Sequence, residues 1–372
     1  MEKKVFWCTS CLAMSTRNRI SFNKEGKCNA CVWSEKKRIL DWSSRENQLE
    51  ELLDNNRSSD KSFDCIVPVS GGKDGSYVAY NLKNKYGMNP LAITVNPPLP
   101  LDIGEKNLKN FINSGYSHIS VSTDTNTMQF LNKNGFIDKG FPYFGWLMAI
   151  QTVPVRLAVN LGINLIFYGE DGEVEYGGST ETSNNFLYDI EYMKNIYLEA
   201  GYDQRIKKAK ELNLDGLDLF QFPNKNSSEL KNLKITHWSY FENWDPYRNY
   251  LVAKEFCGLS EAEENNAGTF TNFAQNDQAL YALHTYLMYL KYGFGRANQD
   301  ACIEIRRGAM ERFQAINLVN LYDGEYPEQF MDLYLNYYKM TLAEFNQILD
   351  KWANKKLFRK ENNRWIPNFT IV

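Results

Sequence analysis

Ser70-Gly71-Gly72-Lys73-Asp74-Gly75-Ser76 is the stretch that decides the fold, because of what stands on either side of it. The apolar run 65–69 precedes it and predicts a buried parallel strand. Apolar residues then recur every four positions from 78 to 86, which predicts an amphipathic helix that ends near Gly87. A glycine turn between a strand and a helix N-terminus is typical of phosphate binding, because its bare N–H groups point at the anion.

The type of loop indicates the chemistry. A Walker A loop needs glycine, four residues, and then Gly-Lys-Ser/Thr, whereas here Asp74 follows Lys73, and the residues before Gly72, Pro68 among them, include no glycine where the pattern requires the first one. The stretch resembles instead the PP-loop of the ATP pyrophosphatases, Ser-Gly-Gly-x-Asp-Ser, although Gly75 replaces the last serine of that pattern. The alternative is a glycine turn that binds no ligand.

The resemblance to the PP-loop implies a grip on the β- and γ-phosphates of ATP as leaving pyrophosphate, so that the substrate becomes adenylated. We expect Lys73 and Asp74 to be catalytic. The residues expected to bind ATP or pyrophosphate are Ser70, Gly71, Gly72, Lys73, Asp74, Gly75, Ser76, Val95 and Gly169.

Strands and helices alternate after the loop, which predicts an α/β fold with a parallel sheet. The predicted strands are residues 65–69, 91–95, 118–122, 163–168 and 234–241, and the predicted helices are 34–53, 104–114, 126–134 and 144–161. Ligands of such sheets lie at the carboxyl ends of the strands. We therefore expect the loop after Ser70 and the turn after Val95 to share one crevice.

Three regions are expected along the 372 residues: a zinc ribbon with a linker helix (1–60), a PP-loop domain (61–241) and a helical C-terminal region for substrate or partner (242–372). Residues 180–233 read as a mixed helical insertion, with a loop at 224–228. The composition, 43% apolar and 23% charged, is that of an ordinary globular protein. The net charge of −3 argues against a broad nucleic-acid surface.

Location is suggested by two further features. No uninterrupted apolar run has the length of a membrane span, and the N-terminus has no apolar signal core. We therefore expect a cytoplasmic protein with reduced thiols and no membrane partner.

Four of the seven cysteines form two Cys-x-x-Cys pairs, Cys8 with Cys11 and Cys28 with Cys31. This spacing is typical of a zinc ribbon, in which four thiolates hold a structural zinc and leave no position open for catalysis. A disulfide pairing is the weaker alternative. The nearby basic residues, Arg17, Arg19, Lys24 and Lys27, are interpreted as a solvated face.

An acidic turn, Gly169-Glu170-Asp171-Gly172-Glu173-Val174-Glu175, follows the predicted strand 163–168. Mg²⁺ is bound by one or two carboxylates together with phosphate oxygens. We expect Asp74 and Glu175, with Glu170 as a possible third ligand, to hold Mg²⁺. The alternative is a solvated acidic turn.

The C-terminal region is rich in aromatic residues and is predicted to be helical. It contains the run Lys291-Tyr-Gly-Phe-Gly-Arg296, and Lys291, Arg296 and Arg306 are candidates for binding an anionic part of a substrate. A helix junction with surface arginines is the alternative. His118, His237, His284, Cys65, Cys257 and Cys302 are isolated and expected to be structural.

Taken together, the cysteine pairs, the loop, the motif Gly169-Glu-Asp…Glu175-Tyr-Gly-Gly178 and the run 291–296 resemble the N-acetyl sugar amidotransferases of bacterial surface-glycan pathways. The resemblance covers nearly the whole chain, and the most similar members act in pseudaminic acid biosynthesis for flagellin glycosylation. It implies that an acetamido group of a sugar becomes an acetamidino group, with ATP consumed and ammonia supplied by a separate glutaminase. The chain itself shows no Gly-x-Cys-x-Gly elbow and no cysteine at position 2.

Two other functions remain open. A PP-loop tRNA thiolation enzyme would need a sulfur-carrying cysteine near the loop, for which Cys65 is the candidate, and a basic surface for RNA. A zinc-ribbon interaction protein with a regulatory nucleotide site would release no pyrophosphate.

Overall fold

A computed structural model of the protein describes residues 5–60, 62–224 and 228–371. Its main sheet has six strands in the order β3-β2-β1-β4-β6-β5. The strands of this sheet are β1 Cys65–Pro68, β2 Pro90–Val95, β3 His118–Val121, β4 Leu165–Tyr168, β5 Leu187–Tyr188 and β6 Lys234–His237. All neighbours pair in parallel except β5, which pairs antiparallel with β6 at the edge. The predicted parallel α/β fold is confirmed.

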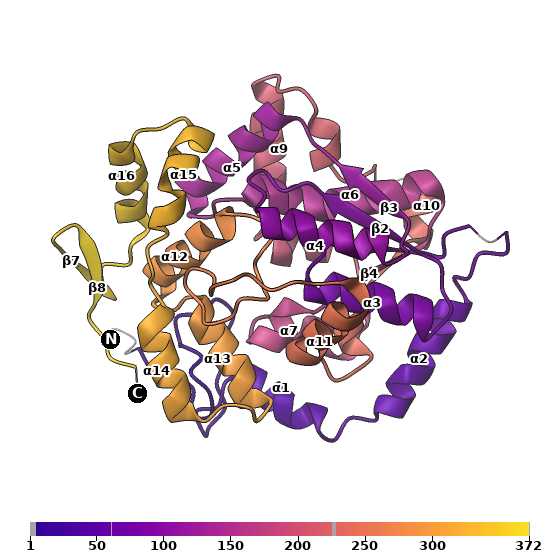
Figure 1. Ribbon diagram of the computed structural model, residues 1–372, viewed down its shortest axis with the longest axis horizontal. Coiled ribbons are helices and arrows are strands. Elements are labelled where there is room, and N and C mark those ends of the chain that lie inside the picture. The colour runs from indigo at the N-terminus through magenta and orange to yellow at the C-terminus, as the bar shows by residue number, and fades with distance from the viewer. Residues whose placement is uncertain (1–4, 61, 225–227, 372) are drawn as a thin grey trace.

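Helices surround this sheet and make up most of the C-terminal third (Figure 1). The helices are α1 Asn29–Lys37, α2 Trp42–Asp54, α3 Lys73–Asn84, α4 Asp102–Asn113, α5 Thr125–Lys139, α6 Phe144–Leu161, α7 Gly172–Tyr176, α8 Ile190–Tyr192, α9 Tyr202–Glu211, α10 Ser228–Asn232, α11 Pro246–Cys257, α12 Leu280–Tyr292, α13 Arg296–Arg306, α14 Arg312–Tyr322, α15 Met331–Tyr338 and α16 Leu342–Trp352.

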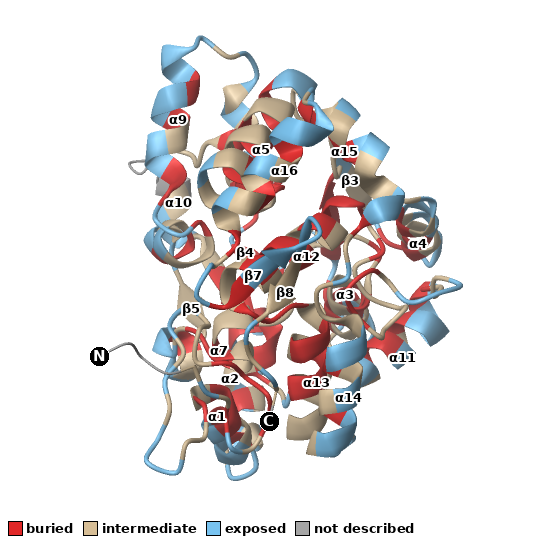
Figure 2. Ribbon diagram, turned by 90° about the vertical axis from the view of Figure 1, so that its left-hand side faces the viewer, coloured by how far each residue is buried: buried red, intermediate tan, exposed pale blue. Residues whose placement is uncertain are grey.

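Each face of the sheet carries its own hydrophobic core. Cys65, Val67 and Val69 pack in one core with residues of α2, α3 and α11, whereas Ile66 packs in the other with α5, α6 and α12. This alternation is the period of two of a strand with both faces covered. In Figure 2 buried residues gather on the inward faces of the helices, as an enclosed sheet requires.

Pro68 fits the sheet because it is the last residue of β1. It pairs with β2 opposite Ile93, whereas the pairing of β1 with β4 is centred on Ile66, two residues earlier. The missing N–H of proline therefore costs no hydrogen bond in the middle of a ladder.

Two predictions of secondary structure were wrong. The single helix predicted over 34–53 is two helices. The first ends at Lys37, and Asp41 caps the start of α2, its side chain accepting a hydrogen bond from Ser44 N at 2.9 Å. The C-terminal region is not helical throughout, because β7 Phe358–Glu361 and β8 Arg364–Pro367 form an antiparallel hairpin. The loop predicted at 224–228 falls largely on residues 225–227, which lie outside the described residues.

Helix α6 is the one helix among the described residues that is long and apolar enough to span a membrane. Of its 18 residues, 61% are buried within the fold, and Ala149, Val153 and Ala158 are fully enclosed. Burial of this kind is also found in the central helix of a globular core.

The three predicted regions share cores. The four cysteines pack against Ala301 and Cys302 of α13 and Val319 of α14, and α11 packs along α3. Figure 1 shows α13 and α14 beside the N-terminal segment. The domain boundaries predicted at 60 and 241 stay predictions. The hydrophobic cores of the described residues extend across both boundaries.

Candidate active site

The loop between β1 and α3 approaches the neighbouring helix α4 closely at Gly71. Its φ is +80°, and a Cβ on it would stand 2.3 Å from Leu108 N. A Cβ on Gly75 would stand 2.7 Å from Pro68 O. Glycine is required at both positions, the first for its backbone conformation and both for space. Gly72 then caps α3, whose first-turn N–H groups face the loop.

An apolar cleft of about 620 Å³ lies at the carboxyl ends of β1 and β2, as expected for this fold. Val95, predicted to bind ATP, lines it, and its carbonyl accepts a hydrogen bond from Trp146 Nε1 at 3.1 Å. Ile93, Pro97, Ile150 and Pro154 add apolar walls. The cleft has the size and lining of a site for a nucleoside.

A polar chamber of about 280 Å³ adjoins this cleft, since Ser70, Gly104, Asp277 and Tyr281 line both. From the loop, Gly72, Lys73, Asp74 and Gly75 line the chamber, and from other elements Asn107, Tyr143, Glu170, Gln275, Asn276 and Arg296 do so. Five of the seven predicted loop residues therefore face these two cavities.

The other predicted ATP-binding residues lie elsewhere. Ser76 is fully buried in α3, and its hydroxyl has no hydrogen-bond partner among the described residues. Gly71 provides the close turn onto α4. Gly169 packs behind Asp74, since a Cβ on it would stand 3.1 Å from the Asp74 Cβ.

Charged groups converge on the chamber. Lys73, 7% exposed, contacts the Asp74 carboxylate with its ammonium group. Burial raises the pKa of Glu170, and the neighbouring Asp74 raises it further, while Lys73 opposes the shift. The Glu170 carboxylate accepts hydrogen bonds from the Tyr176 hydroxyl and from Trp244 Nε1 at 3.2 Å.

These carboxylates fit a hard cation. Asp74 and Glu170 both line the chamber, and the shift of the Glu170 pKa reflects the cost of two negative charges close together in a buried place. Mg²⁺ prefers carboxylate and phosphate oxygens of this kind.

Glu175, also predicted as a Mg²⁺ ligand, lies outside the chamber. Its carboxylate accepts hydrogen bonds from Trp33 Nε1 at 2.9 Å and from Lys37 Nζ at 2.7 Å. Both members of the ion pair are mostly buried, with side chains 8% and 13% exposed. This geometry makes Glu175 a link between α7 and α1 and does not support metal binding by it.

The three candidate anion-binding residues lie in three different parts of the structure. Arg296 lines the chamber and pairs with Asp300 at 2.8 Å. Lys291 donates to the backbone carbonyl of Lys139 at 2.8 Å, away from the chamber. Arg306 lies against the cysteine cluster, 3.8 Å from Cys11 Sγ.

Sequence analysis missed Asp277 and Tyr281. The segment before α12 pairs with the end of the β2 loop, through a bridge between Pro100 and Gln278, and this pairing lays Asp277 over Ser70. Burial raises the pKa of Asp277, whose carboxylate accepts from Tyr281 at 3.2 Å. No local pattern marks the segment, because its place depends on a contact between distant parts of the chain.

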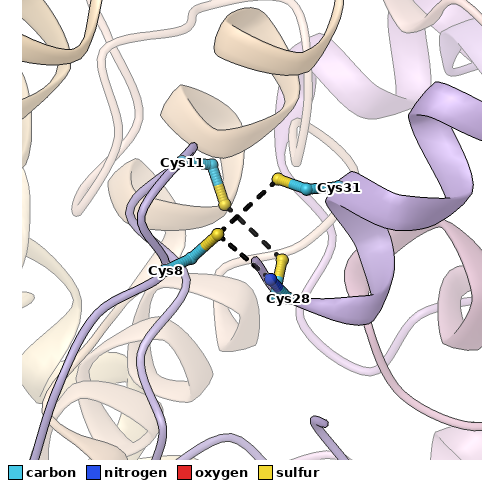
Figure 3. Close-up of side chains that lie close together, drawn as sticks. All are labelled: Cys8, Cys11, Cys28 and Cys31. Carbon is cyan, nitrogen blue, oxygen red and sulfur yellow. Dashed lines mark hydrogen bonds between the residues drawn. The ribbon is translucent and has the colours of Figure 1, made fainter. Parts of the chain in front are cut away.

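The four cysteines predicted to bind zinc form a tight cluster, with all four sulfur atoms within 4.8 Å of one another (Figure 3). The Sγ atoms of Cys8 and Cys31 lie 3.8 Å apart, and those of Cys11 and Cys28 lie 3.7 Å apart. A tetrahedral zinc with bonds of about 2.3 Å places its sulfur ligands about 3.8 Å apart. The cluster therefore fits one zinc ion, whereas a multi-iron cluster spreads its thiolates over several metals.

Of the four basic residues near the cysteines, Lys24 is exposed and Lys27 pairs with the exposed Glu35, as predicted for a solvated face, whereas the two arginines are not part of such a face. Arg19 forms a bidentate ion pair with Glu173, with distances of 2.8 and 2.6 Å. Arg17 packs over the ring of Tyr176. The ribbon is thereby attached to the acidic turn.

Cys65 and Cys257 are buried, which agrees with the structural role predicted for them. Cys65 is fully enclosed in the sheet and its burial raises its pKa, so the residue is unsuited to carry sulfur to the loop. Burial also raises the pKa of Cys257 to about 11 and lowers that of His284 to about 3.

The fold and site define an α/β protein with a glycine loop between a strand and a helix, two adjoining cavities beside that loop, and a four-cysteine cluster. Residues 267–370 match the family model described as the C-terminal domain of WbpG-like LPS biosynthesis proteins. This range contains Arg296 and Asp277 of the chamber. It supports a role in glycan biosynthesis.

Two further similarities are weaker. An uncharacterized protein of Methanocaldococcus jannaschii is 32% identical over 90 residues, which are 24% of this chain and 32% of that protein, so the match spans about a third of the relative. The structure of the U34-tRNA thiolase NcsA from Methanococcus maripaludis with its 4Fe-4S cluster is 13% identical, covering 72% of this chain and 79% of that chain with a TM-score of 0.31. A TM-score this low carries no weight for fold or function.

Proposed function

We propose that this protein is an ATP-dependent, AMP-forming amidotransferase that converts an acetamido group of a bacterial glycan sugar to an acetamidino group. The observation that supports it most directly is the pair of adjoining cavities, an apolar one of about 620 Å³ and a polar one of about 280 Å³ that meet at Ser70. The similarity of residues 267–370 to an LPS biosynthesis domain supports a sugar substrate.

The cavities divide the reactants between them. The nucleoside of ATP occupies the apolar cleft near Val95, and the phosphates lie at the glycine loop and the N-terminus of α3. The acetamido group enters the polar chamber, where Tyr143 and Gln275 offer hydrogen bonds to sugar hydroxyls. Arg296, which pairs with Asp300, offers its remaining N–H groups to an acidic sugar. Pseudaminic acid, which carries a carboxylate, fits this arrangement.

Adenylation makes the amide reactive. The acetamido carbonyl oxygen attacks the α-phosphorus, the bond from that phosphorus to the β-phosphate oxygen breaks, and pyrophosphate leaves. Loss of the amide proton gives an imidoyl-AMP. Lys73 and the loop N–H groups stabilise the charge that grows on pyrophosphate.

Asp74 and Glu170 are the residues that would hold Mg²⁺, which would neutralise charge on the pyrophosphate when bound. Ammonia then attacks the imidoyl carbon, the carbon–oxygen bond to AMP breaks, and the amidine forms. A separate glutaminase in the cytoplasm would supply the ammonia, since ammonium dominates at neutral pH.

Mass spectrometry tests this function. The purified protein is incubated with ATP, Mg²⁺, ammonium and either free or nucleotide-linked pseudaminic acid, and a panel of N-acetylated LPS sugars is run in parallel. The expected product has NH in place of the acetamido oxygen and appears together with AMP and pyrophosphate. Formation of ADP, or AMP release without any sugar product across the panel, would contradict the proposal.

A further inference from the structure

A third cavity lies behind the reaction chamber, away from the nucleoside cleft. It has a volume of about 200 Å³ and is lined by Ser34, Asn243, Pro246, Ile303 and Arg306, among others. These residues come from α1, from the start of α11 and the segment before it, and from α13, and no described residue of these elements lines the nucleoside cleft.

Glu170 separates the two spaces, because it lines both the chamber and the third cavity. Tyr176 and Trp244 line the third cavity, and both donate hydrogen bonds to the Glu170 carboxylate, at 2.8 and 3.2 Å. The side chains of Glu170, Tyr176 and Trp244 form a partition between the chamber and the third cavity, here called the Glu170 gate. The partition is one carboxylate thick.

We propose that the third cavity is the entry port for ammonia and that the Glu170 gate admits ammonia to the imidoyl-AMP. This inference rests on the proposed function. ATP and the sugar fill the two front cavities, so the third reactant needs a route of its own. A closed partition also keeps bulk water from the intermediate, which water would convert back to the acetamido sugar and AMP.

The charges of the port suit a neutral reactant. Lys37, Arg38, Arg306 and Arg307 face Glu170, Glu175 and Asp245 across it, and Lys37 pairs with Glu175 while Arg307 pairs with Asp245. The charged side chains that remain, Arg38, Arg306 and Glu170, leave a small excess of positive charge, which does not concentrate ammonium. When the ammonia nitrogen attacks the imidoyl carbon, the carbon–oxygen bond breaks and AMP departs with its electron pair. One proton of the ammonia moves to the imidoyl nitrogen, so the product is the amidinium cation and the step needs no further base.

Blocking the port tests the inference. Ser34→Trp and Asn243→Trp each place a large side chain in the third cavity, and Asn243 is exposed, so its replacement leaves the core intact. Glu35→Trp is the matched control, because it adds the same side chain to the exposed side of α1, outside the cavity. Zinc content and melting temperature are measured for all three variants.

Two rates are compared. Sugar-dependent exchange of labelled pyrophosphate into ATP reports adenylation without ammonia, and amidine formation at rising ammonium concentration reports the second step. We expect the blocked variants to keep exchange within about twofold of wild type while their KM for ammonium rises about 10-fold or more, as for loss of access by one reactant. The control should match wild type in both.

The outcomes separate the two claims. A blocked, folded variant with an unchanged KM for ammonium overturns the port and leaves the amidotransferase function in place. Wild-type protein that performs no exchange and forms no amidine overturns the proposed function, and the port with it.

Discussion

Tyr176 donates its hydroxyl to the Glu170 carboxylate at 2.8 Å from both oxygens. The two residues stand six positions apart and are joined by the short helix α7, so the turn that ends β4 carries both the carboxylate and the group that orients it. Trp244 supplies a second donor from a distant part of the chain. A carboxylate held on two sides in this way has a defined position beside Asp74 while the Glu170 gate is closed, as catalysis by positioning requires.

Glu170→Gln should lower the rate of pyrophosphate release by about 100-fold or more while the melting temperature stays near that of wild type, because it removes a charge from the reaction chamber. Glu175→Gln should leave the rate of pyrophosphate release near that of wild type and lower the melting temperature. It leaves Lys37 buried without its partner and should lower the free energy of unfolding by about 3 kcal/mol. Steady-state kinetics and thermal unfolding of both variants check the pair, and full activity in Glu170→Gln would move the site elsewhere.

The free energy of unfolding should depend on pH through the carboxylate of Asp323. Its carboxylate caps α13 by accepting from Gly295 N at 2.8 Å, and burial raises its pKa from 3.8 to about 7. The pKa of Asp323 is higher in the folded state than in the unfolded state. Its contribution to the free energy of unfolding is therefore fully present below pH 3.8 and is lost as the pH rises through about 7. Between about pH 6 and 8 this group should lower the free energy of unfolding by about 1.4 kcal/mol.

Asp323→Asn should remove that part of the pH dependence, since an amide oxygen can still accept the hydrogen bond but does not titrate. Denaturant unfolding at several pH values measures it, with Asp332→Asn, an exposed carboxylate of α15, as control. Equal slopes of stability against pH in wild type and Asp323→Asn would show that Asp323 is ionised throughout.

One zinc per chain is expected from the cysteine cluster. Cys28→Ser should lose the metal and lower the melting temperature, because the cluster packs against α13 and α14. Arg296 stands at the start of α13, so activity should fall along with stability. Elemental analysis that finds no zinc in freshly purified protein, or iron in its place, would contradict the assignment.

Ammonium salts should support amidine formation by the isolated chain, increasingly as the pH rises and the share of neutral ammonia grows. Glutamine alone should not, because the sequence shows neither of the familiar glutaminase motifs. Adding a cognate glutaminase should confer the use of glutamine. Amidine formation from glutamine by the pure chain would show that it carries its own glutaminase activity.

The sequence predicts local features of the site well. The strand, loop and helix around Gly71 follow from short-range patterns, and the spacing of Cys8, Cys11, Cys28 and Cys31 is enough to specify a four-sulfur cluster. Which glutamate of the acidic turn faces the chamber does not follow from the turn itself. Glu170 precedes α7 and Glu175 lies within it, so the helix directs their side chains to different partners.

Long-range contacts are the other limit. Asp277 reaches the chamber because its segment bridges to Pro100, and Trp244 reaches Glu170 from beyond the sheet. The antiparallel strand β5 has only two residues and depends on β6 for its pairing. None of these features has a periodic or compositional pattern along the chain, so they could not be predicted from it.

The central claim is that the acetamido oxygen of a sugar attacks the α-phosphorus of ATP. A sugar labelled with ¹⁸O in its acetamido carbonyl, incubated with the protein, ATP, Mg²⁺ and ammonium, tests it most directly. The account predicts that the label appears in the phosphate of AMP while the sugar gains nitrogen and pyrophosphate stays unlabelled. Label that remains in the sugar, or that appears in the phosphate released with ADP, would contradict it.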